Sequence, residues 1–296
     1  MKPSEIKQRY LNGENITALL REANNTQTNS EEIIEVAYDL QAGSYIEAMD
    51  DPAMRAHKDE YAQQIASDIL SLCEPSSILE AGVGEATTLS GVVSSLPRGI
   101  ASFGFDLCWS RVAYARRWLK ALGHGDTFVC TGSLFNIPLL DNSIDVVYTS
   151  HTIEPNGGNE EPILRELLRV TGNYLVLLEP GYELAGDDAR RRMESLGYCR
   201  GLKEIAERLD CEVLEHRLFP YTANPLNPTA ITILRKKNQE APIAESFLAC
   251  PKYKTPLQSL NGHYFSPESL MVYPVIGDVP CLRLENGIIA SKYPDV

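Results

Sequence analysis

The stretch Ile78-Leu-Glu-Ala-Gly-Val-Gly84 decides the fold of this chain, because a short apolar run leads there directly into two closely spaced glycines. The pattern predicts a buried strand, then a tight turn, then a helix. Gly82 and Gly84 have no Cβ atom, so the turn can adopt positive φ angles and let a nucleoside-sized ligand lie against the main chain. Glycine turns after strands also occur for purely steric reasons, and this stretch alone leaves both interpretations open.

Acidic residues near the turn narrow the choice of ligand. Asp106 ends a second expected strand about twenty residues further on, where a carboxylate accepts hydrogen bonds from ribose hydroxyls. Glu80 precedes the glycines and Glu85 follows them, so a phosphate group would meet negative charge there. The turn also lacks the third glycine of a phosphate-binding loop. A cationic or zwitterionic ligand suits this field, which favours an adenosine that carries an amino acid and a sulfonium.

Several segments follow one another in an order that is more specific than any one of them. They are Leu79–Glu85, Gly104–Leu107, Gly132–Pro138, Asp141–Ser150, and a helix at Glu161–Val170 with the strand Tyr174–Pro180. In this order they resemble the class I S-adenosylmethionine-dependent methyltransferases, over about residues 38 to 236. The resemblance implies S-adenosylmethionine as the cofactor.

The same resemblance implies which residues surround the cofactor. They are Tyr38, Glu80, Gly82, Gly84, Asp106, Leu107, Ser133, Leu134 and Ser150. Where the family commonly has an aspartate that accepts a hydrogen bond from the adenine amino group, this chain has Ser133. We expect the Ser133 hydroxyl and the backbone amide of Leu134 to contact the adenine instead.

The hydrophobic pattern predicts an α/β fold, because short runs rich in β-branched residues alternate with longer amphipathic segments. We expect strands near residues 77–81, 101–106, 126–131, 144–149, 173–179, 211–219 and 229–235. Helical apolar spacing recurs at 57–72, 109–122 and 201–209. The resemblance implies a Rossmann-like, seven-stranded methyltransferase sheet whose last strand is antiparallel.

Two groups of charged side chains are expected to lie on the protein surface. On the helix at 109–122 we interpret the basic residues as a solvated face rather than a binding patch; they are Arg111, Arg116, Arg117 and Lys120. On the helix at Glu161–Val170, Glu166 and Arg169 are three residues apart and are expected to form a surface ion pair.

The chain divides by composition into three expected regions. These are an N-terminal helical and lid region at 1–75, an S-adenosylmethionine-binding methyltransferase domain at 76–237 and a small β-rich module at 243–296. The segment from Lys236 to Pro242 has the composition of a linker.

The N-terminal region has its own internal pattern. Two short helices are expected within residues 1–37, separated by the polar stretch Asn24–Ser30, and Ser30 suits a helix cap. The segment Tyr38–Ile46 mixes aromatic, amide and glycine residues, so it suits either a lid over a small ligand or a surface linker. As a lid it would bring Gln41 and Tyr45 to the substrate.

Segments of the C-terminal region resemble the small zinc-ribbon-like methyltransferase-activator family. The resemblance rests on Phe247–Leu257, Tyr264–Ser266 and Tyr273–Leu282. A structural zinc site needs about four thiolate or imidazole ligands, but Tyr253 stands where a second cysteine would be. With only Cys250 and Cys281 left, we expect no metal.

The aromatic residues of this region can fill its own core or pack against the methyltransferase domain, and both readings stay open. They are Phe247, Tyr264, Phe265 and Tyr273. The eukaryotic members of the activator family act as separate subunits that keep methyltransferases of this class folded and active. The resemblance therefore implies a supporting module fused to the catalytic domain.

Composition sets the outer limits of function. The 296 residues include 40 acidic and 27 basic side chains, which gives a formal net charge of −13. A surface of this charge repels polyanions, so nucleic acid is a disfavoured partner. There is no apolar run of membrane-spanning length and no apolar signal core, so we expect a soluble cytoplasmic protein of unknown oligomeric state. The seven cysteines are scattered singly, as is typical of reduced thiols.

His151 is the candidate general base for a hydroxyl acceptor. It follows the fourth expected strand, at the carboxyl edge where ligands bind to open α/β sheets, and imidazole exchanges a proton near neutral pH. An alternative is that His151 only orders its loop or the lid. Further candidates for contact with the substrate are Asn156, Tyr182 and Tyr221.

The sequence therefore predicts a methyltransferase that acts on a small or medium polar acceptor, with a sugar or glycoconjugate hydroxyl as one candidate. A second hypothesis has a translation factor or RNA as the acceptor, and the net charge argues against the RNA version. A third hypothesis, from a different class, is a non-catalytic protein that binds the cofactor to scaffold or regulate a partner.

Overall fold

The structure is a computed structural model that describes residues 1–209, 211–237 and 247–295. Its centre is a seven-stranded sheet in the order β3-β2-β1-β4-β5-β7-β6. The strands are β1 (Ser77–Ala81), β2 (Ala101–Asp106), β3 (Phe128–Thr131), β4 (Ile144–Ser150), β5 (Thr171–Pro180), β6 (Cys211–Leu218) and β7 (Thr229–Lys236). β7 runs antiparallel to both of its neighbours, and the pairs among β1 to β5 are parallel. The predicted α/β class, the seven strands and the antiparallel last strand are confirmed.

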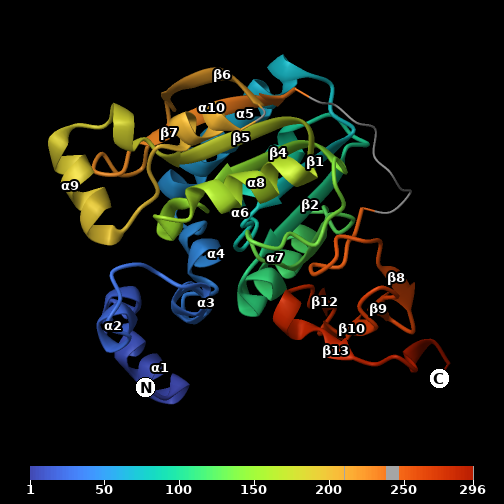
Figure 1. The fold of residues 1–296 in the computed structure, drawn as a ribbon. Coiled ribbons are helices and arrows are strands. Elements are labelled where there is room, and N and C mark those ends of the chain that lie inside the picture. The colour runs from blue at the N-terminus through green and yellow to red at the C-terminus, as the bar shows by residue number, and fades with distance from the viewer. Residues whose placement is uncertain (210, 238–246, 296) are drawn as a thin grey trace.

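Helices cover both faces of this sheet (Figure 1). One face packs against α5 (Pro52–Leu72), α6 (Thr87–Ser95) and α7 (Trp109–Ala121), and the other packs against α8 (Glu160–Val170) and α10 (Leu202–Arg208). Adjacent strand residues alternate between the two cores: Ile78 lies in the first and Leu79 in the second. Burial of both sheet faces explains why the central strands are apolar throughout instead of alternating with polar residues.

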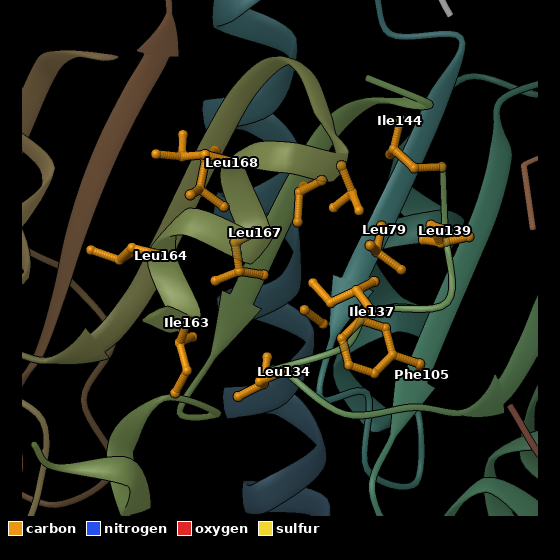
Figure 2. Packing of buried hydrophobic residues seen from close by; sticks show 14 of the residues in the cluster. Leu79, Phe105, Leu134, Ile137, Leu139, Ile144, Ile163, Leu164, Leu167 and Leu168 are labelled. Carbon is orange, nitrogen blue, oxygen red and sulfur yellow. The ribbon is translucent and has the colours of Figure 1, made fainter. Parts of the chain in front are cut away.

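The apolar stripe of α8 shows how a helix is fixed to the sheet. Its buried residues are Ile163, Leu164, Leu167, Leu168 and Val170. Figure 2 shows four of these beside Leu79 of β1 and Ile144 of β4. A fully buried leucine contributes about 1.5–3 kcal/mol through removal of its surface from water, so this stripe accounts for the helix's position.

Ahead of α5, the described residues of the N-terminal region form four helices, α1 (Pro3–Leu11), α2 (Ile16–Ala23), α3 (Glu31–Leu40) and α4 (Ser44–Ala48). The expectation of two helices within residues 1–37 was wrong, because a break at Gly13, with φ of 82°, separates α1 from α2. The Ser30 cap is confirmed: its side chain accepts a hydrogen bond from the Ile33 amide at 3.3 Å. α5 begins earlier than expected, at Pro52, where Asp51 caps it.

The C-terminal region forms a small antiparallel β module. Its sheet has the order β13-β10-β9-β8, and a separate ribbon pairs β11 with β12. The strands are β8 (Gln258–Leu260), β9 (His263–Ser266), β10 (Met271–Tyr273), β11 (Val275–Ile276), β12 (Val279–Pro280) and β13 (Ile288–Ile289). Residues 238–242 of the expected linker lie outside the described residues. In Figure 1 the module (red) and the N-terminal helices (blue) flank α7.

This module covers the edge of the central sheet at β3. The backbone of Cys281 pairs with that of Thr131 in an isolated parallel β-bridge, and the Leu282 amide donates a hydrogen bond of 3.1 Å to the Thr131 hydroxyl. Leu248 bridges Leu139 in the same region. Because an exposed edge strand offers unpaired backbone groups to other chains, this packing also protects the sheet.

The module also shares a hydrophobic core with the central sheet. Tyr273 and Leu282 are fully buried in the cluster that contains Leu79 and Ile144. The Phe247 ring lies 4.8 Å from the Phe103 ring, between ring centroids. Of the aromatic residues expected to pack, Tyr264 contacts this cluster, whereas the Phe265 ring stacks on Tyr293 of the module itself.

Two surface interpretations need correction. The solvated face of α7 holds for Arg117 and Lys120, which are exposed, but not for Arg111. Arg111 is only 5% exposed. The Glu166–Arg169 pair is largely buried as well, because the Arg169 guanidinium also donates to the carbonyl oxygens of Ile137 and Leu139 and Glu166 also pairs with Lys254. These partners come from distant parts of the chain, so helical spacing alone could not show the burial.

Candidate functional site

A cavity of about 290 Å³ opens where β1, β2 and β4 end, beneath α3 and α4. Most of the predicted cofactor residues line it: Tyr38, Glu80, Gly82, Gly84, Asp106, Leu107, Leu134 and Ser150. The candidate base His151 and the candidate substrate residues Tyr45 and Asn156 line it too. The carboxyl ends of parallel strands meet at one edge, which explains why residues so far apart in sequence surround a single cavity.

The glycine turn forms one wall of the cavity. Gly82 and Gly84 have φ angles of 73° and 53°, in the left-handed region that glycine adopts most easily. A Cβ atom on Gly82 would lie 2.0 Å from Cγ2 of Thr152, so only glycine fits there. Asp106 holds the turn in place: its two carboxylate oxygens accept hydrogen bonds of 2.9 Å from the amides of Gly84 and Cys108.

Glu80 and Lys58 place an acidic and a basic side chain in the cavity. Glu80 is 2% exposed and accepts a hydrogen bond of 3.0 Å from the Tyr148 hydroxyl, and burial raises its pKa to about 8. Burial lowers the pKa of Lys58, and the charge of Glu80 opposes this effect. Among the described residues, the Lys58 ammonium has no hydrogen-bond or ion-pair partner and lies 5.6 Å from the centre of the Tyr61 ring.

His151 lies at the end of β4 with an unusual backbone. Its φ is 54°, a conformation that costs a non-glycine residue about 1–3 kcal/mol. The bend lets the Glu179 carboxylate accept hydrogen bonds of 3.0 to 3.1 Å from the next three backbone amides, those of residues 152 to 154. Glu179 therefore fixes the loop that carries the candidate base.

Both ring nitrogens of His151 have partners. Nδ1 lies 2.5 Å from a Glu154 carboxylate oxygen, and Nε2 lies 2.8 Å from the Thr229 hydroxyl. Burial lowers the pKa of His151, but the hydrogen bond and charge of Glu154 outweigh burial and leave this pKa raised. The Glu154 carboxylate also accepts a hydrogen bond of 3.1 Å from Asn227, and its own pKa is lowered. This arrangement is an imidazole oriented by a carboxylate, as general bases often are.

Glu31, on the first turn of α3, reaches the loop expected to contact adenine. The Ser133 hydroxyl donates a hydrogen bond of 2.5 Å to one Glu31 carboxylate oxygen, and Glu31 lines the cavity. Burial raises the pKa of Glu31. Ser133 itself does not line the cavity, although its neighbours Gly132 and Leu134 do. The chain therefore brings a carboxylate to this position from a helix about a hundred residues earlier in the sequence.

The segment from α3 to α4 covers the cavity and is held by buried charges. The Glu85 carboxylate accepts hydrogen bonds of 3.0 and 2.9 Å from the amides of Gly43 and Ile46, at the start of α4. The Arg111 guanidinium donates a hydrogen bond of 3.1 Å to the Tyr38 carbonyl and lies between the rings of Tyr38 and Tyr45, 4.9 and 4.7 Å from their centres. This segment is hereafter called the lid.

Three predicted substrate residues lie away from the cavity. Gln41 caps the end of α3, Tyr182 donates a hydrogen bond of 2.5 Å to Glu194, and Tyr221 packs against Phe219. Their roles toward an acceptor stay predictions. Sequence reasoning did not identify Lys58, Glu31 or Arg111 as site residues, because each reaches the cavity from a helix whose local pattern carries no signal for ligand binding.

The parts of the chain that the structure describes hold no group of three or more histidine, cysteine or acidic side chains placed to bind a metal ion. None of the helices in these parts is long and apolar enough to cross a membrane.

A family comparison agrees with this geometry. Residues 79–174 match the profile of the family described as Methyltransferase domain. The matched segment covers 96 of the 296 residues. It includes the glycine turn, Asp106 and His151, and it runs from β1 into β5. None of the curated proteins matches the chain.

Solved structures show the same fold. The chain is similar to magnesium protoporphyrin IX methyltransferase from Synechocystis PCC 6803 with bound SAH, at 12% identity, over 70% of this chain and 100% of that chain, with a TM-score of 0.51. It is also similar to a chain from the complex of the Haloferax volcanii Trm112 methyltransferase activator with a methyltransferase partner. There the identity is 15%, the coverage 68% of this chain and 98% of that chain, and the TM-score 0.52. These identities establish the fold alone.

Proposed function

We propose that this chain transfers a methyl group from S-adenosylmethionine to a small or medium polar acceptor, with a sugar or glycoconjugate hydroxyl as the leading candidate. The observation that carries the proposal is the set of charges in the cavity of the methyltransferase domain. It combines Asp106, at the carboxyl end of β2 where ribose hydroxyls bind in folds of this kind, with the acidic side chain of Glu80 and the basic side chain of Lys58.

The methionine end of the cofactor is a zwitterion that this pair can accept. Under the proposal, the Lys58 ammonium donates to the α-carboxylate and the Glu80 carboxylate accepts from the α-amino group. The Lys58 ammonium lines the cavity without a hydrogen-bond or ion-pair partner among the described residues, so an incoming carboxylate would supply its counterion. The unpaired state of Lys58 is thus the structural feature that fits this ligand best.

The adenine end would meet groups of complementary polarity. Adenine presents an amino donor beside a ring-nitrogen acceptor. Glu31 offers a carboxylate oxygen that Ser133 does not use, and Leu134 contributes a backbone amide from the same wall of the cavity. We propose that Glu31 accepts from the amino group and that the Leu134 amide donates to the ring.

His151 is the proposed general base. When bound, the cofactor supplies a methyl group on a sulfonium that is already a strong leaving group. The protein then has to hold an acceptor in line, remove its hydroxyl proton and exclude water. His151 can take that proton on Nε2 when this nitrogen releases the Thr229 hydroxyl, while Glu154 stabilises the resulting imidazolium from Nδ1. The lid shields the cavity from solvent.

The three-region division belongs to the same proposal. Residues 1–75 supply the lid, 76–237 the methyltransferase domain and 243–296 a module that supports it. The support rests on the buried cluster shared by the module and the sheet and on the bridge between Cys281 and Thr131. An activator-like role for the module is part of this proposal.

Cofactor binding can be tested separately from turnover by calorimetry with S-adenosylhomocysteine and with 5′-methylthioadenosine, which lacks the amino-acid group. We expect Lys58→Met to weaken S-adenosylhomocysteine binding about tenfold or more, since a hydrogen bond to a charged group is worth about 1.5–3 kcal/mol. Binding of 5′-methylthioadenosine should stay as in the unsubstituted protein. Equal losses for both ligands would contradict the role of Lys58, and no binding of either would contradict the proposed function.

The acceptor class can be tested with labelled S-adenosylmethionine added to a cell extract, which is then separated into glycan and metabolite, protein and RNA fractions. Label in the glycan or metabolite fraction supports the proposal. Label confined to protein or RNA would contradict the glycan or metabolite acceptor and favour a translation factor or RNA as the acceptor. Binding of the cofactor without label in any fraction would favour a non-catalytic scaffold. The His151→Gln variant is the control that measures background labelling.

A further inference from the structure

Helix α3 of the lid is fastened at several points along its length. Glu31, near its start, bonds to Ser133, and Asp39, near its end, accepts a hydrogen bond of 3.1 Å from the Ser110 amide. Ser133 lies in the loop that follows β3, and Ser110 lies on α7. Between these two points, Glu35 pairs with Arg283, which belongs to the C-terminal module.

Arg283 connects the lid to the loop that follows β2. Its side chain is 12% exposed, and its Nη1 atom pairs with the Glu35 carboxylate. The same Nη1 donates to the carbonyl oxygen of Leu107 at 3.4 Å, and Leu107 lines the cavity directly after Asp106. A single guanidinium thus joins the module, the lid helix and the cofactor loop.

The backbone around Arg283 is anchored, so its side chain is held at a defined place. The amide of the preceding residue, Leu282, bonds to the Thr131 hydroxyl on β3, and Leu282 is fully buried. On the lid side, the Glu35 carbonyl accepts a hydrogen bond of 3.4 Å from the Cys108 thiol. Both ends of the ion pair are therefore fixed to the sheet.

We propose that Arg283 is a positioning residue that holds the lid closed over the cofactor cavity, so that the C-terminal module sets the affinity for the cofactor. The identity of the ligand in this inference rests on the proposed function. The role of Arg283 in holding the lid closed does not depend on that ligand. The charge balance gives the reason: Glu31, Glu35 and Glu285 surround one guanidinium. Without it, two carboxylates on successive turns of α3 would repel each other and Glu285, and the helix would leave the cavity more often.

Coupling between two sites in a protein typically changes affinity about five- to 150-fold. For Arg283→Gln we expect S-adenosylhomocysteine to bind about fivefold more weakly or worse, chiefly through faster dissociation, as for a lid that opens more often. Glu35→Gln removes the same contact together with one of the repelling carboxylates, so it should weaken binding less than Arg283→Gln. The double variant should be no worse than Arg283→Gln alone, because both substitutions remove the same contact. Arg283→Lys, which keeps the charge, should recover part of the affinity.

Lys254→Gln is the matched control. Lys254 is also a partly buried cation of the module, and it pairs with Glu166 at 2.6 Å on the methyltransferase domain, away from the lid. Arg283→Gln and Lys254→Gln should lower the unfolding temperature of the ligand-free protein similarly, whereas only Arg283→Gln should weaken cofactor binding. Equal affinities for the Arg283→Gln variant and the unsubstituted protein, or equal losses in the two variants, would overturn the proposal.

Hydrogen exchange of the α3 amides separates this inference from the proposed function. In the ligand-free protein, Arg283→Gln should speed exchange across Glu31–Leu40 at least about fivefold and leave the β1 amides unchanged. If the unsubstituted protein binds no S-adenosyl compound but α3 exchange is still faster in the Arg283→Gln variant, the proposed function fails and the positioning role of Arg283 is supported. If α3 exchange is the same in both proteins, the positioning role of Arg283 is contradicted, whichever ligand the protein binds.

Discussion

The two walls of the cofactor cavity are built in different ways. The sheet wall consists of turns that directly follow β1, β2 and β4, and its key contacts are short and largely backbone-mediated, such as the Gly84 amide bound to Asp106. The lid wall consists of α3 and α4 and depends on side chains that arrive from elsewhere, among them Glu85, Arg111 and Arg283.

The difference teaches which wall defines the ligand and which one controls access to it. A backbone turn packed on a buried sheet can hardly move without unfolding, so it sets the shape of the site. A short helical segment held by a few buried charges can open at a cost of only those contacts. Changes in the sheet wall should therefore abolish binding, while changes in the lid wall should weaken it in steps.

The largest effect is expected from Gly82→Ala. The new Cβ atom would have to displace Thr152, whose own amide is bound to Glu179, and the φ of 73° disfavours alanine. We expect cofactor affinity to fall by about 100-fold or more, and the protein to lose about 3 kcal/mol or more of unfolding free energy. Calorimetry and chemical denaturation measure the two quantities.

Gly99→Ala is the control for that substitution. Gly99 also has a positive φ, 94°, but nothing lies within 4 Å of a Cβ atom placed there. It should therefore lose about 1 kcal/mol from backbone strain and keep its cofactor affinity. If both alanine variants bind alike, the sheet wall does not define the ligand as argued above.

A smaller effect is expected from Glu85→Gln in the lid wall. The substitution removes one of two charge-assisted hydrogen bonds to the amides of Gly43 and Ile46, and it places an NH₂ group against an N–H donor. S-adenosylhomocysteine should bind about tenfold more weakly, while the unfolding transition stays cooperative. Glu47→Gln, at an exposed position on α4, is the control. Complete loss of binding would mean that the lid wall also shapes the site.

Glu31→Gln should change selectivity more than affinity. A glutamine can present either its oxygen or its NH₂ group, so it accepts from an adenine amino group less well but donates to the oxygen of hypoxanthine. We expect about fivefold weaker binding of S-adenosylhomocysteine and a narrower gap between it and S-inosylhomocysteine. Glu32→Gln, in the same helical turn, should keep the original gap. An unchanged gap in the Glu31 variant would remove this residue from the adenine site.

The smallest effect concerns pH and compares stability with turnover. The pKa of His151 is raised in the folded protein, so its ion pair with Glu154 stabilises the fold fully below about pH 6.5 and loses this contribution as pH rises through the folded pKa. The lowered pKa of Glu154 keeps that carboxylate charged through this range. Turnover that needs neutral His151 should rise over the same interval in which stability falls. His151→Gln should flatten both curves, and parallel curves would contradict the role of His151 as a base.

Much of the sheet wall was predictable before the structure was known. The run from Ile78 to Gly84, the acid Asp106 and the seven strands all follow from local patterns, because strands, turns and caps depend on residues close together in sequence. The same holds for the Ser30 cap. The position of His151 beyond β4 was predictable too, although its left-handed backbone and its contact with Thr229 were not.

The sequence by itself determined a parallel sheet, a glycine turn, and acids at the ends of its first two strands. Only the tertiary structure decided that Lys58 stays unpaired in the cavity, that Arg111 is buried between tyrosines, and that Arg283 reaches the lid. The physical reason is that these side chains are long and charged, so their preferred place on an isolated helix or loop is water. Arg111 and Arg283 lie inside the protein only because distant segments supply the carboxylate, the carbonyl oxygens and the aromatic rings that contact them.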